Sequence, residues 1–546
     1  MGLDELRWRI DALDDEIVKL ICARLRVCAD IASYKAENGL PVHDPEREGR
    51  KQADVLVKAD EDLRGYVGAV YSRIFEQSRE FQKAWQRTMH DTRHQKTIVS
   101  AAPLCDASPQ VGARFGVLGA RLGHSYSPLI HALLADYEYR IFEKGPEELE
   151  GFLLEGDFDG LNVTIPYKEA VLPYCTSISS EAARIGAVNT LIRLAGGGLY
   201  GDNTDYYGFS YMLGRLGVSV KGRKALILGD GGAAAAVRAV LSDRGAGEIV
   251  NITRRGADNY GDIDRHFDAG VIINATPVGM YPGNGASLVD LGGFRSCEAV
   301  LDLVYNPLKT ELILQAEDEG IPCEGGLRML VAQAKRASEI FIGCRGAGGV
   351  AEPRKGGVPD SAPGHIDPCA SNESIALIER VVGTARRKVK NIALIGMPGC
   401  GKTSVGRRLA EITGREFFDT DELVALEAGK GVERIIAEDG EDAFRGMEEA
   451  ALMDAAKMSG CVIATGGGIV KREANRRLLR QNSVVVFIDR APDELPADGR
   501  PLSQLHGAGR SYGERLPLYL EWSEHKITAR SDVGRTAAAV KEVLGV

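Results

Sequence analysis

The segment from Gly396 to Thr403 constrains the fold of this chain more than any other part of the sequence. It reads Gly-Met-Pro-Gly-Cys-Gly-Lys-Thr and stands between an apolar run, residues 391–395, and a stretch with helical spacing. Glycines in such a turn let successive backbone N–H groups face one phosphate, and the helix that follows adds its positive end. The pattern predicts an α/β P-loop domain over residues 388–546.

This loop predicts a nucleotide site without naming the molecule that receives the phosphate. Lys402 is expected to reach the β- and γ-phosphates of ATP, and the Thr403 hydroxyl to bind Mg²⁺. The residues expected to contact the nucleotide are Gly399, Cys400, Gly401, Lys402, Thr403 and Ser404. No Asn-Lys-x-Asp motif follows, which disfavours a GTPase. An adenylate kinase stays an alternative, because its loop has the same form.

Residues further along separate these alternatives. They are Asp419 and Asp421, Arg445 three residues before Glu448, the run Gly466–Gly468, Arg500, Arg515 and Tyr519. This ordered set resembles shikimate kinases over residues 388–546. The resemblance implies that Asp419 helps to hold Mg²⁺, that Asp421 binds the shikimate hydroxyls and accepts a proton, and that Arg500 meets the nucleotide phosphates.

The same resemblance assigns the carboxylate of shikimate to Arg445 and Arg515. A planar guanidinium suits this task because it can bind both carboxylate oxygens. The backbone of Gly466, Gly467 and Gly468 would approach the ring.

Strand-like runs alternate with helical stretches over residues 112–343, which predicts α/β layering with a mostly parallel sheet. One run, residues 224–228, enters a turn in which Gly229, Gly231 and Ala234 fit the glycine pattern of dinucleotide-binding (Rossmann-type) domains. The next strand is expected to end near Asn251, and two arginines follow it in place of an acid. This favours the 2′-phosphate of NADP.

Several polar blocks surround this glycine turn in the sequence. They are Ser125 to Ser127, Asn162 to Lys168, Ala187 to Thr190, Gly201 to Asp205, Asn274 to Met280, Asp302 to Pro307 and Gly325 to Gln333. In this order they resemble shikimate dehydrogenase over about residues 112–343. The resemblance implies a substrate part, about 112–215 and 325–343, and an NADP part, about 216–324.

By this resemblance Lys168 and Asp205 flank the reacting C–O bond. Hydride delivery to a ketone leaves an alkoxide, which a lysine oriented by a carboxylate can protonate. The residues expected to hold shikimate are Ser125, Ser127, Thr164, Asn189, Tyr305 and Gln333. Those expected to contact NADP(H) are Gly229, Gly231, Gly232, Ala233, Asn251, Thr253, Arg254, Arg255, Thr276 and Gly326.

Two points stay open in this middle region. Asp230 stands in the glycine turn where these enzymes usually carry a small neutral residue. Its charge either faces solvent or lowers the affinity for the cofactor. Quinate is an alternative substrate beside shikimate.

The first 87 residues have helical spacing, with a helix start at Asp44-Pro45 and a third helix from about Leu63 to Trp85. Arg7 and Arg24 lie 17 residues apart, about 25 Å along one helix, so they cannot reach one small ligand together. Arg24 and Lys35 return to nearly the same face. The simplest joint interpretation is an antiparallel homodimer in which the partner subunit contributes the first arginine.

Eight positions of this helical region match the all-helical type of chorismate mutase. They are Arg7, Arg24, Lys35, Asp44, Arg47, Glu48, Ser78 and Gln82. The resemblance implies that the three arginines bind the two carboxylates of chorismate, that Lys35 and Gln82 donate to the ether oxygen, and that Glu48 holds the ring hydroxyl. The alternative is a non-catalytic dimerisation or ligand-sensing module, with only the dehydrogenase and kinase parts active.

Composition supports a multidomain cytoplasmic enzyme. The 546 residues exceed what one core can organise. The net charge of −10 argues against a nucleic-acid partner, and no apolar run is long enough to span a membrane. The ten cysteines form no Cys-x-x-Cys pair, which suits a reducing compartment. The expected order is a helical mutase domain (1–88), a linker (89–111), the dehydrogenase (112–343), a linker with a short helix (344–387) and the kinase (388–546).

Overall fold

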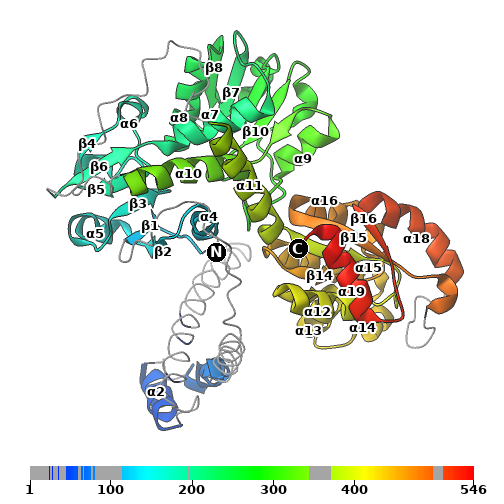
Figure 1. Ribbon diagram of the computed structural model, residues 1–546. Coiled ribbons are helices and arrows are strands. Elements are labelled where there is room, and N and C mark those ends of the chain that lie inside the picture. The colour runs from blue at the N-terminus through cyan, green and yellow to red at the C-terminus, as the bar shows by residue number, and fades with distance from the viewer. Residues whose placement is uncertain are drawn as a thin grey trace, which may run out of the picture. The chain divides into compact units, whose positions relative to one another are not determined.

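The computed structural model describes residues 45–58, 63–65, 67–75, 78–79, 114–123, 125–194, 197–343, 371–495 and 508–546, together with Arg24, Cys28 and Lys35. The chain forms two compact units, residues 1–106 and residues 107–546 (Figure 1). Among the described residues, no helix combines the length and the apolar character needed to cross a membrane.

The described part of the first unit is helical. Helix α2 spans Pro45–Lys58 and so begins at the expected proline. Helical residues at 64–65, 67–75 and 78–79 fall within the third helix that the sequence predicts. Val55 and Phe75 are buried, and the Arg24 guanidinium lies 5.5 Å from the Phe75 ring centre. Apolar spacing therefore builds a small helical core, as expected.

The second unit begins with a six-stranded mixed sheet in the order β2-β1-β3-β5-β6-β4. Its strands are β1 (Arg114–Gly119), β2 (Glu138–Glu143), β3 (Gly160–Val163), β4 (Cys175–Ile178), β5 (Thr190–Arg193) and β6 (Leu199–Asp202). The helices of this part are α4 (Ser127–Leu134), α5 (Leu149–Glu155), α6 (Ser180–Ile185), α7 (Thr204–Leu216) and α10 (Leu327–Gly343). Strand β5 runs antiparallel to β3 and β6, and the remaining pairs are parallel.

A second sheet is entirely parallel, in the order β11-β10-β9-β7-β8. Its elements are β7 (Lys224–Leu228), α8 (Gly232–Asp243), β8 (Glu248–Ile252), β9 (Val271–Asn274), β10 (Ala299–Asp302), α9 (Glu311–Asp318) and β11 (Cys323–Glu324). The chain passes from β7 to β8 on one side and returns to β9 on the other. The connections that leave β7 and β9 therefore run to opposite sides of the sheet, and sheets of this kind bind ligands at the carboxyl end of such a switch point.

Helix α11 (Asn372–Val389) connects this region to the next sheet. It is longer than the short helix that the sequence predicts, and its apolar face packs on α4 and α10. Ile378, Val381 and Val382 share one buried cluster with Ile130 and Val331. A single residue, Lys390, separates α11 from the next strand.

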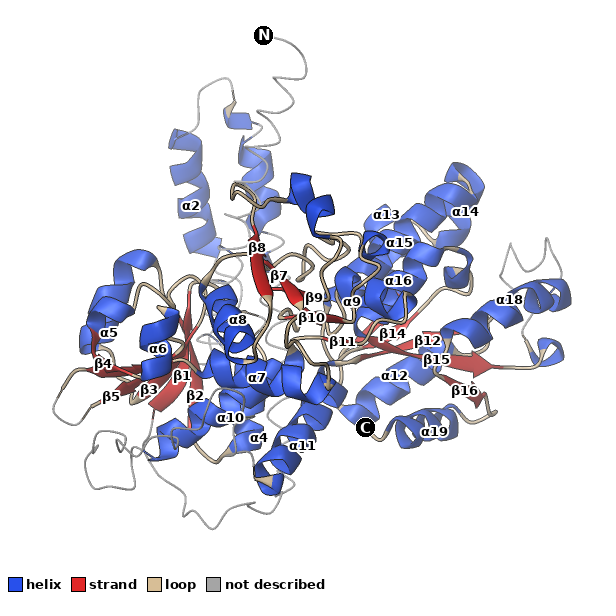
Figure 2. Ribbon diagram, turned by 90° about the horizontal axis from the view of Figure 1, so that it is seen from above, coloured by secondary structure: helices blue, strands red, loops and turns tan. Residues whose placement is uncertain are grey.

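The C-terminal sheet is parallel throughout, in the order β13-β14-β12-β15-β16 (Figure 2). Its strands are β12 (Asn391–Ile395), β13 (Phe417–Asp419), β14 (Val462–Ala464), β15 (Ser483–Asp489) and β16 (His525–Thr528). Its helices are α12 (Lys402–Thr413), α13 (Thr420–Ala428), α14 (Val432–Asp439), α15 (Glu441–Lys457), α16 (Glu473–Asn482), α18 (Ala508–Trp522) and α19 (Val533–Leu544).

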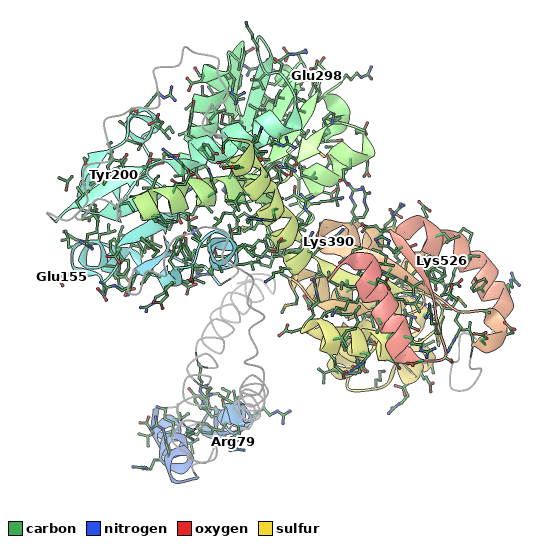
Figure 3. The ribbon with its side chains drawn as sticks, viewed as in Figure 1. Arg79, Glu155, Tyr200, Glu298, Lys390 and Lys526 are labelled. Carbon is green, nitrogen blue, oxygen red and sulfur yellow. The ribbon has the colours of Figure 1, made fainter. Side chains whose placement is uncertain are left out.

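The central strands of this sheet are buried, whereas its edge is polar. Ile392, Leu394 and Val486 are at most 1% exposed. On the edge strand β16, Lys526 pairs with Asp489 at 2.9 Å (Figure 3). A charged edge of this kind discourages pairing with further strands.

Candidate active sites

Lys168 and Asp205, the pair predicted to flank the reacting bond, are in direct contact. Lys168 Nζ donates to Asp205 Oδ2 at 2.6 Å, and the two side chains are 16% and 7% exposed. Asp205 lies in the first turn of α7, where Asn203 caps the helix by accepting from the Tyr206 N–H. The 37-residue separation gives no reason to expect contact, so this pairing is a product of the tertiary fold.

A hydrogen-bond network beside this pair joins two predicted shikimate ligands, Asn189 and Gln333. Asn189 Oδ1 accepts from the Thr204 N–H at 2.7 Å and from its hydroxyl at 3.1 Å. The Thr204 hydroxyl also lies 3.2 Å from Gln333 Oε1. Thr204 was not predicted to be a site residue. Its position next to Asp205 is the signal that could have identified it.

The remaining predicted shikimate ligands follow β1 and β3 or lie in the loop after β10. Ser127 is 6% exposed, and its N–H donates to Ser125 Oγ at 3.3 Å. Ser125 hydrogen-bonds the Tyr305 hydroxyl, while burial raises the pKa of Tyr305. Thr164 follows β3, and its N–H donates to Leu118 O at 2.9 Å. These side chains therefore lie at the carboxyl ends of parallel strands.

The predicted cofactor turn fits a dinucleotide. Gly229 has φ +113°, and a Cβ there would lie 2.9 Å from Thr276 Cγ2, so the loops after β7 and β9 are in contact. Gly231 caps α8 and has open space where a Cβ would stand. A Cβ on Gly232 would lie 3.4 Å from Lys168 Cβ. The helix N-terminus that would receive the pyrophosphate thus lies beside the lysine.

Other predicted cofactor residues support or border this turn. Asn251 Nδ2 donates to Gly229 O at 2.7 Å, and Asn251 Oδ1 accepts from Arg238. Thr253 Oγ1 accepts from the Gly256 N–H at 2.8 Å, which orders the turn carrying the exposed Arg254 and Arg255. Ala233 lies in the first turn of α8.

Two further predicted positions, Thr276 and Gly326, are held by residues at the carboxyl ends of β9 and β10. Thr276 Oγ1 donates to Asn274 Oδ1 at 2.7 Å, and Asn274 in turn donates to Asp302 at 3.0 Å. Asp302 is fully buried, which raises its pKa to about 6. Gly326 packs so tightly that a Cβ would lie 2.2 Å from Leu303 O. Asp230 and Arg254 both lie close enough to Tyr260 to act on its pKa, which the carboxylate raises and the guanidinium lowers.

In the C-terminal region the phosphate loop closes around Lys402. Gly401 has φ +101° and leads directly into α12. Lys402 Nζ donates to Gly396 O and Met397 O, both at 2.9 Å, and lies 3.8 Å from the Cys400 sulfur. The ammonium group is therefore held inside the loop, where phosphate oxygens would be bound.

Thr403 and Asp419 form an oxygen pair suited to Mg²⁺. Thr403 Oγ1 donates to Asp419 Oδ2 at 2.7 Å, and Asp419 Oδ1 accepts from the Asp421 N–H at 3.0 Å. One hydroxyl and one carboxylate are what a protein usually offers Mg²⁺ at a phosphate site, because phosphates and waters supply the other ligands. The residues present therefore fit this ion.

Acids and bases converge on the glycine run that follows β14. A Cβ on Gly466 would lie 2.1 Å from Glu448 Oε1 and 2.7 Å from Asp421 Oδ1, and one on Gly468 would lie 2.1 Å from Arg445 Nη2. Glu448 is fully buried and accepts from Arg445 Nη1 at 2.6 Å. Burial and the neighbouring Glu448 and Asp419 raise the pKa of Asp421 to about 6.

Arg515 and Tyr519 approach the same run from α18. Arg515 Nη1 donates to Gly467 O at 3.0 Å, and the Tyr519 hydroxyl donates to the same oxygen at 2.6 Å. The sequence suggested no role for Glu448 or Tyr519. In the structure Glu448 pairs with Arg445, and Tyr519 holds the carbonyl group of Gly467. The i, i+3 spacing of Arg445 and Glu448 is the signal for their pairing.

One cavity of about 680 Å³ is lined both by the phosphate loop and by the charged residues around the glycine run. Its lining includes Ser404, Asp421, Arg445, Arg515 and the loops 398–403 and 465–468. Arg490 and Arg530, which the sequence did not single out, also line it. Arg500 lies outside the described residues.

In the first unit, the structure brings two predicted mutase residues together. Arg24 donates to the Ser78 hydroxyl, which itself donates to Ile74 O at 2.6 Å. Lys35 is half-buried, Arg47 is exposed on α2, and Glu48 lies on the same helix. Arg7, Asp44 and Gln82 lie outside the described residues.

Together, these folds and sites define an enzyme that carries a Rossmann-type sheet and a P-loop phosphate site in one unit and a helical fold in the other. Three family profiles match the chain. They are Chorismate mutase type II at residues 6–83, Shikimate dehydrogenase substrate binding domain at 117–191 and Shikimate kinase at 398–544.

Curated relatives cover the middle of the chain. NADP(+) shikimate dehydrogenases of Clostridium perfringens (strain SM101) and Halothermothrix orenii are both 38% identical, over 253 and 279 residues. The matches cover 42% and 44% of this chain and 93% of each relative.

Two solved structures are also similar to this chain in sequence. A chorismate mutase/shikimate 5-dehydrogenase fusion protein from Clostridium acetobutylicum is 34% identical, with 50% of this chain and 96% of that chain covered and a TM-score of 0.42. A shikimate dehydrogenase from Peptoclostridium difficile is 37% identical, with 42% and 92% covered and a TM-score of 0.40.

The chain belongs to the shikimate dehydrogenase family, with a chorismate mutase domain before that region and a shikimate kinase domain after it. The expected multifunctional enzyme of the shikimate pathway is confirmed.

Proposed function

We propose that this chain reduces 3-dehydroshikimate to shikimate with NADPH, phosphorylates shikimate at its 3-hydroxyl with MgATP, and rearranges chorismate to prephenate. The contact between Lys168 and Asp205 beside the cofactor turn carries the first assignment. The curated relatives, named as NADP(+) enzymes, support the choice of cofactor.

In the dehydrogenase step, the glycine turn before α8 would hold NADPH, which would supply the hydride for the ketone carbon when bound. Lys168 Nζ then gives its proton to the carbonyl oxygen as negative charge develops there, and Asp205 keeps the ammonium group oriented. Ser125 and Ser127 hold the substrate carboxylate. The network through Asn189 and Gln333 fixes the ring hydroxyls, so that one face of the ketone meets the cofactor.

In the kinase step, Asp421 accepts the proton of the shikimate 3-hydroxyl as the oxygen attacks the γ-phosphorus and the bond to the β-phosphate oxygen breaks. Its raised pKa, about 6, brings this carboxyl closer to the proton affinity that a base needs near neutral pH. Arg445 and Arg515 pair with the shikimate carboxylate, and Lys402 neutralises charge on the phosphates. Thr403 and Asp419 would hold Mg²⁺, which screens phosphate charge when bound.

In the mutase step, no bond to the protein is required, because the rearrangement is internal to chorismate. Arg24 is placed by Ser78 and packs on Phe75, which supports its role as a carboxylate ligand. Lys35 and Gln82 would stabilise charge on the ether oxygen. Arg7 would come from the partner subunit of a homodimer formed by the helical domain. We place the enzyme in the cytoplasm, where its thiols stay reduced.

The alternative with a silent helical module is not favoured, because the mutase profile covers residues 6–83. The deciding experiment is an activity panel on the purified full-length protein with chorismate, 3-dehydroshikimate and shikimate. Mutase turnover should be lost in Lys35→Ala while the other two rates persist. A wild-type protein without mutase turnover would support the silent module.

Two further substrates complete this panel. Quinate with NADP and with NAD tests whether the dehydrogenase discriminates between the two ring acids. AMP tests the adenylate kinase alternative, and we expect no phosphate transfer to it, because Arg445 and Arg515 are suited to a carboxylate. Transfer to AMP at a rate comparable to shikimate would contradict the proposal.

A further inference from the structure

The kinase domain contacts the dehydrogenase through the amino-terminal edge of its sheet. Gln481 stands two residues before β15, and Ser459 stands three residues before β14. The cavity of the kinase, in contrast, is lined by residues that follow the carboxyl ends of its strands, among them Asp421, Gly466 and Arg490. Docking through the amino edge therefore leaves the kinase site accessible.

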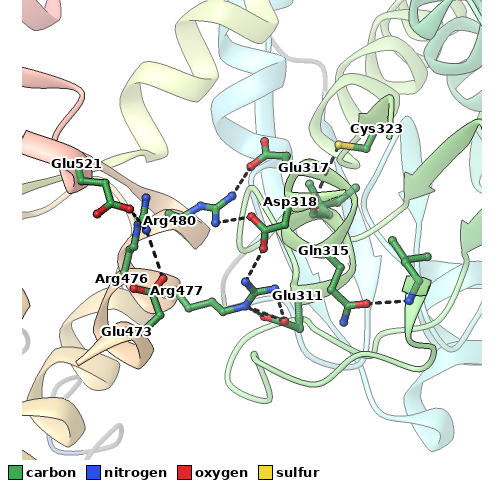
Figure 4. Close-up of polar contacts among 12 residues, drawn as sticks. Glu311, Gln315, Glu317, Asp318, Cys323, Glu473, Arg476, Arg477, Arg480 and Glu521 are labelled. Carbon is green, nitrogen blue, oxygen red and sulfur yellow. Dashed lines mark hydrogen bonds and ion pairs between the residues drawn. The ribbon is translucent and has the colours of Figure 1, made fainter. Parts of the chain in front are cut away.

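Two arginines of α16 fix this docking against α9 of the dehydrogenase (Figure 4). Arg477 binds both oxygens of Glu311, with Nε at 2.8 and 2.9 Å, and donates to Asp318 at 2.6 Å. Arg480 donates to Asp318 at 2.7 Å and to Glu317 at 3.2 Å. Asp318 accepts from both arginines, so the contact is a network rather than an isolated surface pair.

Neutral hydrogen bonds extend the contact towards the substrate part. The Lys309 N–H donates to Gln481 O at 3.0 Å, and Asn284 Nδ2 donates to Gln481 Oε1 at 2.6 Å. Lys309 follows the segment of Tyr305 and Asn306, which borders the predicted shikimate ligands.

This contact reaches the shikimate-binding segment itself at Tyr126. Tyr126 stands between Ser125 and Ser127 and is only 6% exposed. Its hydroxyl donates to Asn306 Oδ1 at 3.0 Å and lies 2.8 Å from the Ser459 hydroxyl of the kinase domain. Its ring lies 5.3 Å from that of Tyr305, the residue that hydrogen-bonds Ser125.

The loop that carries Ser459 is itself anchored to the end of α11. Buried Asn391 donates to Met458 O at 2.7 Å and accepts from the Cys461 N–H at 3.0 Å. The Gly460 N–H donates to Val389 O at 2.8 Å, and a Cβ at Gly460 would lie 2.4 Å from Lys388 O. Because α11 packs in the dehydrogenase core, the loop has a fixed position relative to Tyr126.

We propose that Ser459 of the kinase domain is a positioning residue for the dehydrogenase, acting through Tyr126 on the segment Ser125–Ser127 that binds the shikimate carboxylate. This inference rests on the proposed function of that segment. The kinase domain thereby completes the substrate site of its neighbour, and the arginine network on α16 keeps it in place.

Steady-state kinetics on the full-length chain tests this inference. Ser459→Ala removes one hydrogen bond, so the KM for shikimate in the NADP⁺-dependent oxidation should rise roughly twofold to tenfold. The dehydrogenase kcat, the KM for NADP⁺ and the kinase kcat should stay unchanged. In a Tyr126→Phe background the Ser459→Ala change should have no further effect, because the bond is already absent.

Weakening the ion pairs between α16 and α9 is an independent test that also measures the KM for shikimate. The double variant Arg477→Gln with Arg480→Gln should also raise the KM for shikimate without a loss of kcat. Arg476→Gln is the matched control, since Arg476 lies on the same helix and pairs with Glu521 of the kinase domain at 2.7 Å. Its KM should equal that of the wild type.

An unchanged KM in both Ser459→Ala and the double arginine variant would overturn the inference. Equal effects of the control and the double variant would do the same, because they would indicate general loss of kinase stability. The wild-type rate on shikimate is measured first. A chain that lacks this activity counts against the proposed function, and the inference falls with it.

Discussion

In the predicted dehydrogenase site the lysine and the aspartate neutralise each other, whereas in the kinase site two carboxylates and two arginines crowd around one glycine run. Lys168 and Asp205 form a closed pair at 2.6 Å. Around Gly466–Gly468, in the part of the chain that the structure describes, buried Asp421 Oδ1, Glu448 Oε1 and Arg445 Nε have no hydrogen-bond partner. Asp421 and Glu448 also repel each other when both are ionised, and burial together with this repulsion raises the pKa of Asp421, so the charges of the kinase site are less well balanced than those of the closed pair.

This difference follows from the chemistry of the two steps. Proton delivery to one oxygen needs a single oriented donor, which a lysine and a carboxylate can provide by themselves. Phosphoryl transfer must bind an anionic nucleotide and an anionic acceptor together, so it needs several cations and a base. The comparison predicts that a single substitution disables the dehydrogenase, and that the kinase gains stability when a charge is removed.

The largest effect is expected for Lys168→Met. The dehydrogenase kcat should fall by about 10²- to 10⁴-fold, because the proton donor is lost, while the kinase kcat stays the same. Lys144→Met is the control, since Lys144 pairs with Glu148 at 2.8 Å at the surface of the same domain. A fall of less than about tenfold would mean that another group supplies the proton.

Asp421→Asn should reduce the kinase kcat by about 10²- to 10³-fold, since the amide cannot accept the proton. In the wild type, kcat should rise with pH through about 6 as Asp421 ionises. The variant should lack this rise. If kcat rises with pH in the same way in both proteins, the group that titrates is not Asp421.

Glycine substitutions compare the packing of the two sites. Gly466→Ala places a methyl group 2.1 Å from Glu448 Oε1, so the kinase kcat/KM should drop about a hundredfold. Gly232→Ala meets Ala187 Cβ at 3.2 Å and should raise the KM for NADPH only about threefold. If the two variants had equal effects, the two sites would not differ in how tightly they pack around their glycines.

Asp421→Asn should stabilise the kinase domain, although the same substitution lowers the kinase activity. The folded chain holds this proton more tightly than the unfolded chain, because the folded pKa is raised to about 6. That contribution is present below about pH 4 and is lost as pH rises through about 6. At pH 8, Asp421→Asn should therefore increase the unfolding free energy by about 1 to 3 kcal/mol.

Calorimetry of the kinase transition at pH 4 and at pH 8 measures this effect. The gain from Asp421→Asn should be present at pH 8 and small at pH 4, where the wild-type carboxyl is already neutral. A gain of equal size at both pH values would exclude ionisation as its cause.

The smallest effect is expected at Asp230. Asp230→Asn removes a negative charge from the glycine turn, so the KM for NADPH should fall about twofold at low salt and less at high salt. Asp268→Asn is the control, because Asp268 pairs with Lys224 at the amino end of β7. A higher KM in Asp230→Asn would indicate that this carboxylate contributes to cofactor binding.

Most of the architecture was predictable from the sequence. The apolar runs 224–228 and 391–395, each followed by a glycine turn, predicted β7 and β12, and Pro45 predicted the start of α2, because these signals depend on residues close together in the sequence. The antiparallel insertion of β5 was not predicted, since strand direction depends on partners far apart in the sequence. The packing of α11 on α10 was missed for the same reason.

Some residues of the candidate sites could likewise be named from the sequence, whereas others could not. Lys168, Asp205, Asp421 and Arg445 could be named from the sequence because the ordered polar blocks around them resemble those of shikimate dehydrogenases and shikimate kinases. The roles of Thr204 and Ser459 required the fold, since neither stands in a motif of its own.

The sequence by itself determined the order of the three enzyme regions, the glycine turns and the types of acid and base that each region offers. These properties are local, since a turn or a helix start depends on residues within a few positions. Only the tertiary structure decided that Lys168 meets Asp205, that two carboxylates lie against Gly466, and that Ser459 reaches Tyr126. Contacts between residues 37 or 333 positions apart depend on how whole elements pack, and that packing is a property of the entire chain.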